Sequence, residues 1–182
     1  MAKCKIFVFS SCFRYLFPMP NYIRCFENGH DLFITMVTHR RNPLLVENID
    51  SLRHAFSLCK RRYAFDLKAV VILPDHLHMI IRPEMIATYP KIVSHIKRAF
   101  VYGLKQKGMD ASDVWQRRYY EHTIRNEKDF KNHFDYIHFN PVKHGWARSA
   151  REWRHSSFEK FVREGVYEKE WCDFGGNVEI GE

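Results

Sequence analysis

The sequence predicts an α+β fold, in which a four-stranded antiparallel sheet carries helices on one face in the ferredoxin-like order β-α-β-β-α-β. Three observations lead to this prediction. Segments rich in β-branched and aromatic residues alternate with segments whose apolar residues recur at helical spacing. The Pro74-Asp75 pair separates two strand-like segments in the middle of the chain, which indicates a hairpin. The chain has 182 residues, enough for one domain with its own core.

The elements of this domain follow from local pattern. In order, they are a strand at 32–38, a helix at 49–62, a strand at 63–73, a strand at 76–82, a helix at 90–107, and a strand at 115–124 that could be two short strands around a bend. Apolar residues three and four apart, such as Ile92, Ile96 and Phe100, identify the second helix, and Gly108 closes it.

A further helix is predicted after the sheet, and a C-terminal tail follows it. Asn126 can cap this helix by accepting a hydrogen bond from the amide of Asp129. The apolar residues spaced to pack on the sheet are Phe130, Phe134 and Ile137. The polar residues of the adjoining stripe are Asp129, His133, Tyr136 and Asn140. Pro141 discourages a regular helix at this point, and Gly145 gives the final stop.

We divide the chain into an N-terminal extension at 1–18, a domain at 19–146 and the tail at 147–182. The extension places two lysines before an apolar patch, but Arg14 interrupts the patch and no small-residue cleavage site follows, so a signal peptide is not predicted. Met19 is then the expected natural start, or the extension is dispensable. Intact-mass measurement of the natively expressed protein tests this. No apolar run in the sequence reaches the length of a membrane span.

Composition narrows the class of partner. There are 29 Lys and Arg residues against 21 Asp and Glu, which gives a formal charge of +8 and a pI of about 9.3. Such a balance favours a polyanionic partner, most often nucleic acid. The five cysteines are odd in number and form no C-x-x-C pair, which indicates a reducing compartment and gives no support for a thiolate zinc site.

The most informative stretch is residues 71–83, VILPDHLHMIIRP. His76 and His78 are separated by one residue, so on a strand both imidazoles lie on one face. Two neighbouring imidazoles could form half of a metal site. Taken alone, however, such a pair is more often two ordinary strand histidines, and a lone Tyr136 or Asn140 more often sits at a core edge or a helix end.

The joint pattern resembles a known family. The motifs LPDHLHMI, WQRRYYEHTIRN and DYIHFNPVKHGW, in this order, resemble those of the REP-associated tyrosine transposases, which belong to the HUH single-strand endonuclease superfamily. The resemblance covers about residues 21–171. It implies cleavage of single-stranded DNA beside a hairpin, with the 5′-phosphate retained on a tyrosine. In this sequence the resemblance implies that the tyrosine is Tyr136, and that His76, His78 and Asn140 hold a divalent cation, Mg²⁺ or Mn²⁺.

Contacts to DNA are expected from cationic side chains for the phosphates and aromatic rings for the bases. The candidates are Arg117, Arg118, Arg125, Tyr120, Arg40 and Lys143. The resemblance further implies a cytoplasmic protein that works at the nucleoid, and we favour a monomer over a dimer. Two alternatives stay open at this point. One is a ferredoxin-like nucleic-acid-binding module without catalysis, and the other is a metal-dependent nuclease that uses water while Tyr136 is structural.

Overall fold

The structure, a computed structural model, describes residues 29–172, so the predicted extension at 1–18 and the last part of the tail lie outside the described residues. The strands are β1 (Leu32–Val37), β2 (Phe65–Ile72), β3 (His76–Pro83) and β4 (Tyr120–Thr123). They form one sheet in the order β2-β3-β1-β4, and every neighbouring pair is antiparallel. The predicted α+β class and the antiparallel ferredoxin-like sheet are confirmed.

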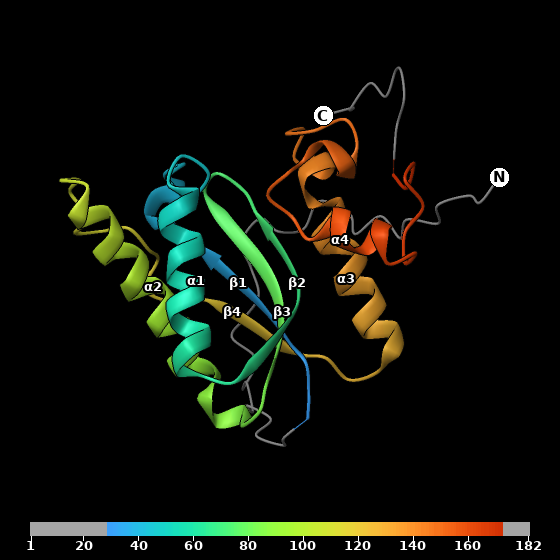
Figure 1. The fold of residues 1–182 in the computed structure, drawn as a ribbon, viewed down its shortest axis with the longest axis horizontal. Coiled ribbons are helices and arrows are strands. Elements are labelled where there is room, and N and C mark those ends of the chain that lie inside the picture. Colours follow the sequence, from blue (N-terminus) through green and yellow to red (C-terminus); the bar gives the residue numbers. More distant parts are fainter. Residues whose placement is uncertain (1–28, 173–182) are drawn as a thin grey trace, which may run out of the picture.

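Helices lie on both faces of this sheet (Figure 1). The α-helices are α1 (Ile49–Arg62), α2 (Tyr89–Gln106), α3 (Glu127–Lys143) and α4 (Phe158–Arg163). Short 3-10 turns are η1 (His39–Arg41), η2 (Ile86–Thr88) and η3 (Ala150–Glu152). The ferredoxin-like helices α1 and α2 cover one face, and α3 with the following segment covers the other. Among residues 29–172, no helix has both the length and the apolar character needed to cross a lipid bilayer.

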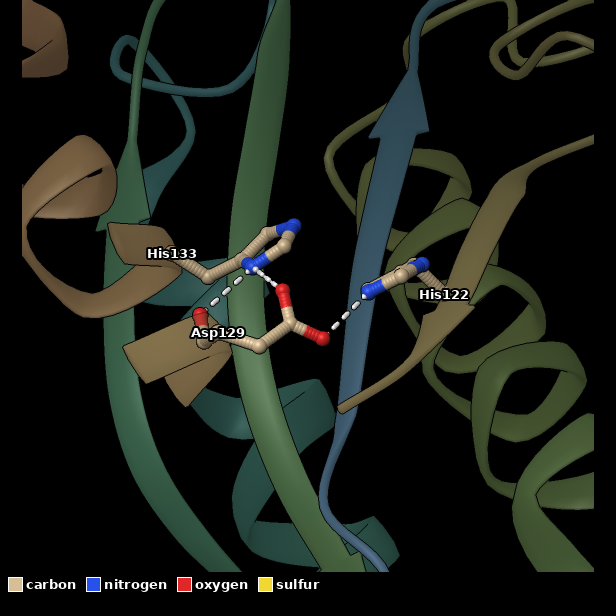
Figure 2. Close-up of side chains that lie close together, drawn as sticks. All are labelled: His122, Asp129 and His133. Carbon is tan, nitrogen blue, oxygen red and sulfur yellow. Dashed lines mark hydrogen bonds and ion pairs between the residues drawn. The ribbon is translucent and has the colours of Figure 1, made fainter. Parts of the chain in front are cut away.

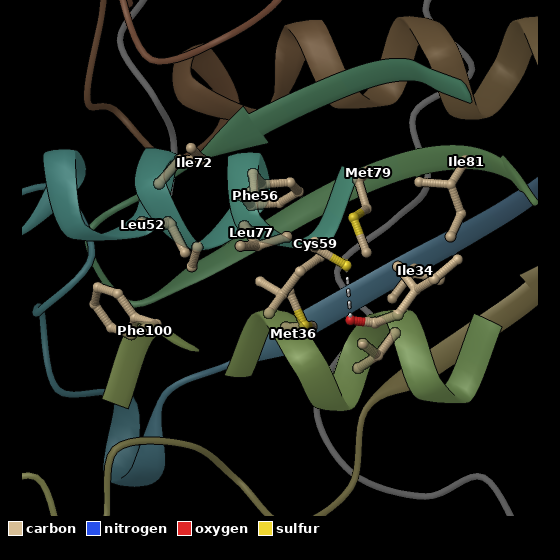
Figure 3. Close-up of a cluster of buried hydrophobic side chains, with 14 of the residues drawn as sticks. Ile34, Met36, Leu52, Phe56, Cys59, Ile72, Leu77, Met79, Ile81 and Phe100 are labelled. Atoms are coloured by element: carbon tan, nitrogen blue, oxygen red, sulfur yellow. Dashed lines mark hydrogen bonds between the residues drawn. The ribbon is translucent and has the colours of Figure 1, made fainter. Parts of the chain in front are cut away.

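The α1/α2 face holds an apolar core (Figure 3). Alternate side chains of the two central strands point into it, including the fully buried Met36 of β1 and Leu77 of β3. Phe100 of α2 is likewise fully buried there. The two helices approach closely, because a Cβ added at Gly103 of α2 would lie 3.2 Å from the Cβ of Ser51 on α1.

The opposite face presents the other set of alternate side chains to α3. Phe33 of β1 and Ile80 of β3 pack there against Phe134 and Ile137 of α3. The remaining members of this core come from the end of the chain, among them Phe158 of α4. The apolar stripe predicted for the helix after the sheet therefore packs on the sheet as expected, and it does so on the face that α1 and α2 leave free.

Helix α3 begins as predicted and ends at Lys143, shortly before Gly145, which was the predicted stop and has a φ of 69°. The side chain of Asn126 accepts a hydrogen bond from the amide of Asp129 at 2.9 Å, so the predicted cap is confirmed. The expectation that Pro141 would interrupt the helix is wrong, since α3 continues to Lys143. Proline removes a single amide donor, and bonds such as that from the Trp146 amide to the Pro141 carbonyl, at 2.9 Å, still close the last turn.

Strand β4 is shorter than the predicted segment at 115–124. Trp115 forms an isolated bridge with Thr38, and the regular strand begins only at Tyr120. The segment therefore consists of two short paired parts around a bend, which was the alternative prediction, and is not one continuous strand.

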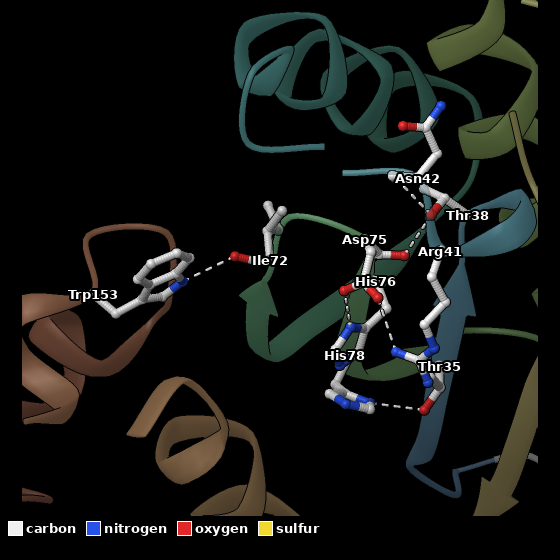
Figure 4. Close-up of polar contacts among 9 residues, drawn as sticks. All are labelled: Thr35, Thr38, Arg41, Asn42, Ile72, Asp75, His76, His78 and Trp153. Carbon is white, nitrogen blue, oxygen red and sulfur yellow. Dashed lines mark hydrogen bonds and ion pairs between the residues drawn. The ribbon is translucent and has the colours of Figure 1, made fainter. Parts of the chain in front are cut away.

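The segment after α3 covers the outer edge of β2. Ser156 forms an antiparallel bridge with Val71, and the amide of Ser157 donates to the Val70 carbonyl at 2.9 Å. The indole of Trp153 donates to the Ile72 carbonyl at 2.9 Å (Figure 4). Backbone groups of an edge strand otherwise remain unpaired, so this segment protects that edge from pairing with another chain.

Candidate active site

The two histidines of β3 lie side by side on the α3 face of the sheet. Their ring centroids are 5.0 Å apart, and the side chains are 4% and 5% exposed for His76 and His78. They share a face because they are two residues apart on a strand. The intervening Leu77 points into the opposite core. The predicted side-by-side placement of the two imidazoles is thus found in the structure.

Hydrogen bonds fix which ring nitrogen each histidine presents (Figure 4). Nδ1 of His76 lies 2.6 Å from the carboxylate of Asp75, and Arg41 donates to the same carboxylate at 2.9 Å. Nδ1 of His78 lies 2.8 Å from the hydroxyl of Thr35, the residue directly opposite it on β1. Because Nδ1 of each ring is hydrogen-bonded, Nε2 is the nitrogen that can bind a metal ion. Metal-binding histidines are commonly oriented by such a hydrogen bond to the other ring nitrogen.

Helix α3 brings Tyr136 to the β3 histidines and carries Asn140 one turn further along. The ring of Tyr136 lies 5.3 Å from that of His78 and 6.1 Å from that of Phe33. Asn140, one turn further along, is fully buried. Within the described chain, neither amide atom of Asn140 nor Nε2 of His78 has a hydrogen-bond partner. Buried polar atoms are rarely left without partners, so a carbonyl oxygen and an imidazole nitrogen at this position fit a bound cation.

The protonation states suit this chemistry. Burial holds the pKa of His78 well below its usual value, and the neighbouring His76 lowers it further, so His78 is neutral and able to bind a cation. Burial raises the pKa of Tyr136, an effect partly offset by the nearby Asn140 amide and by Arg41. The phenol is therefore protonated at neutral pH.

Burial alone would raise the pKa of the Asp75 carboxyl, but hydrogen bonds from His76 and Arg41 outweigh it and keep this pKa far below its ordinary value. A permanently charged carboxylate therefore orients His76. Arg41 itself has a φ of 56°, and Arg40 before it has a φ of 50°. A left-handed backbone conformation is energetically unfavourable for residues other than glycine, and it persists where surrounding contacts enforce it. Here it turns the Arg41 guanidinium toward Asp75.

Sequence reasoning missed His144 and the role of Arg41 at this site. The ring of His144 lies 5.4 Å from that of His76, because α3 continues past Pro141 and carries the next residues over the strand. The motif NPVKHG contains this histidine, but its position depends on regular helix beyond Pro141, where the sequence predicted a disturbance. Arg41 was regarded as part of a basic loop, and the 34-residue separation from Asp75 hides their contact.

The structure places the predicted DNA-contact residues on different parts of the surface. Near Tyr136, the Nζ atom of Lys143 lies 5.0 Å from the centre of the tyrosine ring, and Tyr120 lies across β1 from His78 with half of its surface exposed. On the α2 side, Arg117 lines a groove of about 470 Å³ together with Lys97 and Trp115. The other predicted residues, all exposed, are Arg40, Arg118 and Arg125.

A second group of ligand-type side chains lies on the same face, between β4 and the start of α3 (Figure 2). His122, Asp129 and His133 offer donor atoms that lie within 4.8 Å of one another and could hold a metal ion. One carboxylate oxygen of Asp129 lies 2.9 Å from Nε2 of His122, and the other lies 3.1 Å from Nδ1 of His133. Phe33 separates this group from the β3 histidines, since its ring contacts both His78 and His133.

Comparison with known proteins identifies the family. Residues 28–140 match the family model described as "Transposase IS200 like". A REP-associated tyrosine transposase of Escherichia coli K12 is 36% identical over 166 residues, covering 90% of this chain and 98% of the relative. A second relative, from Haemophilus influenzae, is 36% identical over 174 residues, covering 89% of this chain and 97% of the relative.

A solved structure agrees with this in three dimensions. It is described as the structure of a REP-associated tyrosine transposase bound to a REP hairpin. It superposes with a TM-score of 0.74 at 36% sequence identity, covering 90% of this chain and 98% of that one. The match therefore extends over most of this chain and nearly all of the solved one. The chain belongs to the IS200-like transposases, and among them to the REP-associated tyrosine transposases.

Proposed function

We propose that the protein is a metal-dependent endonuclease and strand transferase that cuts single-stranded DNA beside a hairpin with Tyr136 as the nucleophile. The observation that supports this proposal is the position of Tyr136 against the β3 histidines. The ring of Tyr136 on α3 lies 5.3 Å from that of His78, and the buried, unpaired amide of Asn140 follows one turn further along the same helix.

In the proposed reaction, the phenolic oxygen of Tyr136 attacks the phosphorus of one phosphodiester. The bond from phosphorus to the 3′-oxygen breaks, the phenol loses its proton and the departing 3′-oxygen gains one. The 5′-phosphate stays on the tyrosine. The new bond is again a phosphodiester, so a 3′-hydroxyl can reverse the step and rejoin DNA without a nucleotide cofactor. Burial raises the pKa of Tyr136, so the phenol needs assistance to react at neutral pH.

His76, His78 and Asn140 would hold Mg²⁺ or Mn²⁺. Such an ion, bound by few protein ligands, polarises a phosphoryl oxygen and offsets the charge that develops on it. Two imidazoles with an amide oxygen suit Mn²⁺ well, and abundance favours Mg²⁺ in the cell. Asp75 and Thr35 hold the two rings in place, so their role is to position the ligands rather than to contact DNA.

The substrate class follows from the site's surroundings and from the family. The solved relative is described as bound to a REP hairpin, and we propose a hairpin-bearing single strand as the partner here. Lys143 lies over the Tyr136 ring and would take a neighbouring phosphate, while Tyr120 offers an exposed ring for stacking. Arg40, Arg117, Arg118 and Arg125 would contact phosphates further along the strand.

One assay tests the mechanism against its alternatives. Single-stranded DNA with a hairpin and flanking sequence is labelled at its 3′ end, incubated with protein and Mn²⁺ or Mg²⁺, and then denatured. We expect a labelled covalent adduct, because the tyrosine retains the 3′ fragment. The adduct should be lost in Tyr136→Phe and in His76→Ala, and kept in the control Tyr102→Phe, which alters an exposed tyrosine of α2.

The other outcomes are equally informative. Cleavage without an adduct would favour water as the nucleophile. Binding to several tested hairpins with neither cleavage nor adduct would favour a non-catalytic module.

We further propose that the working unit is a monomer. Helix α3 packs on β2 and β3 of its own chain, so the tyrosine and the histidines meet within one subunit. Mixing Tyr136→Phe protein with His76→Ala protein tests this. If the sites are formed within one chain, the mixture stays inactive. Recovery of adduct formation in the mixture would show that subunits share active sites and would contradict the proposal.

A further inference from the structure

We propose that His122, Asp129 and His133 form a second metal site, separate from the β3 histidines, which binds a zinc-class ion and ties β4 to α3. This site does not depend on the proposed nuclease reaction. The three donors come from two consecutive elements of the chain. His122 belongs to β4, and Asp129 and His133 belong to the first half of α3.

The spacing of the ligands is the first argument. Asp129 and His133 are four residues apart on a helix, so their side chains lie one above the other on the same face. Metal sites commonly take two ligands from one helical face in this way and a third from another element. Antiparallel pairing places His122 opposite Phe33, on the face that α3 covers, and so delivers that third ligand.

The distances provide the second argument. The carboxylate oxygens of Asp129 lie 2.9 Å from Nε2 of His122 and 3.1 Å from Nδ1 of His133. Ligands bonded at roughly 2.0–2.1 Å to a tetrahedral ion lie about 3.3 Å apart. The donor atoms of the three residues lie within 4.8 Å of one another, so movements of the side chains alone would gather them around one ion. Nδ1 of His133 also lies 2.9 Å from the backbone carbonyl oxygen of Asp129, and binding of an ion through Nδ1 would replace this contact. All three side chains are partly exposed, which leaves a path for the ion and a place for water as a fourth ligand.

The donor set selects the kind of ion. Two imidazoles and one carboxylate suit Zn²⁺ and its spectroscopic substitute Co²⁺, whereas Mg²⁺ prefers a shell made of oxygen. The group differs in this respect from the β3 site, where an amide oxygen accompanies the imidazoles. His133 precedes Tyr136 by one helical turn, so an ion at this position would fix the part of α3 that carries the tyrosine. The ion would position the tyrosine without contacting the reacting atoms.

Binding of Co²⁺ tests the proposal, with the tag-free full chain and a His76→Ala/His78→Ala background that removes the β3 pair. We expect this double variant to bind one Co²⁺, to show the visible absorption of a tetrahedral site, and to unfold at a higher temperature with the ion than without it. Adding Asp129→Asn should weaken this binding at least roughly tenfold. The asparagine keeps an oxygen that can accept the Arg125 amide, which donates to Asp129 at 3.0 Å.

A matched control is His54→Gln in the same background, since His54 is an exposed histidine of α1. It should leave Co²⁺ binding unchanged. The proposal is overturned if the double variant binds no Co²⁺, or if Asp129→Asn binds it as tightly as its parent. Neither result bears on Tyr136 chemistry, which the DNA adduct assay reports independently.

A second measurement needs no substitution in the new site. Diethyl pyrocarbonate acylates accessible imidazoles, and peptide mass spectrometry locates the modified residues. In the double variant, Co²⁺ should protect His122 and His133 and leave His54 reactive. Equal modification of all three with and without Co²⁺ would contradict the proposal even if the Asp129 variant failed to fold.

Discussion

The two faces of this sheet use the same four strands for opposite purposes. Toward α1 and α2, alternate side chains such as Met36 and Leu77 build a continuous apolar core. Toward α3, the other set of alternate side chains includes the buried His76 and His78, and α3 itself buries the amide of Asn140 without a hydrogen-bond partner. Burial of apolar atoms on the first face stabilises the fold, whereas burial of polar groups without partners on the second face lowers its stability. The comparison separates the face that stabilises the fold from the face that holds the candidate site.

The largest effect on stability is expected on the α1/α2 face. Phe100→Ala removes a fully buried ring and should lower the free energy of unfolding by about 3–5 kcal/mol, through lost burial and the cavity left behind. Denaturant unfolding followed by circular dichroism measures this. Tyr102→Ala, an exposed residue of the same helix, is the control and should change stability little. Equal losses from both variants would contradict the assignment of the core to this face.

Acid should weaken the α3 face next. His138 is fully buried, and burial lowers its pKa from 6.5 to about 4. The unfolded chain binds this proton more readily, so the stability contributed by neutral His138 is complete above pH 6.5 and is lost as pH falls toward 4. The loss should be on the order of 3 kcal/mol for this group.

Urea unfolding at pH values between 7 and 4 measures the slope. His138→Gln should flatten it over this range, because glutamine does not titrate there. A slope unchanged by the substitution would mean that other groups account for the acid sensitivity.

A smaller loss is expected where the tail holds α3. The hydroxyl of Tyr167 lies 3.2 Å from Nδ1 of His138 and donates to Asp135 at 2.8 Å. Tyr167→Phe removes these contacts and should cost about 1–3 kcal/mol, because the fully buried His138 loses a hydrogen-bond partner. Thermal unfolding reports the change, with Tyr102→Phe as a control. If tail and helix fold independently, the two variants will unfold alike.

The smallest effect should have the opposite sign. Asn140 is buried with both amide atoms unpaired, so Asn140→Leu, of similar volume, should stabilise the protein by about 1 kcal/mol. The same change should abolish formation of the DNA adduct. A stable variant that still forms the adduct would show that Asn140 is not needed at the site, and a destabilised one would show that its amide has partners after all.

Local pattern predicted most of the fold and part of the site. Alternation in the stretch around His76 and His78 was enough to predict that both rings share a face, because strand periodicity needs no tertiary information. It could not predict that Thr35 orients His78, since that contact depends on the register of two strands 43 residues apart. The assignment of Tyr136 and Asn140 as functional residues rests on the family motif and stays a proposal to be tested.

Where sequence reasoning failed, it had given a local rule too much weight. Pro141 was expected to disturb the regular helix before its stop at Gly145, but packing on the sheet outweighs one missing hydrogen bond. That error concealed His144, which reaches His76 only because the helix continues. Asp129 and His133 were recognised as a polar stripe, whereas His122 joins them only through the pairing of β4 with β1.

The segment that covers the edge of β2 also affects the order in which the protein becomes functional during synthesis. Ser157 binds the backbone of Val70, which precedes it by 87 residues, and Tyr167 binds His138 of α3. Chains emerge from the ribosome with the N-terminal part first, and contacts between distant residues form late. The sheet and its histidines can therefore form before the tyrosine helix has its last anchors. The site that we propose for DNA cleavage is therefore complete only after the segment that carries Ser157 and Tyr167 has been synthesised and has packed on β2 and α3.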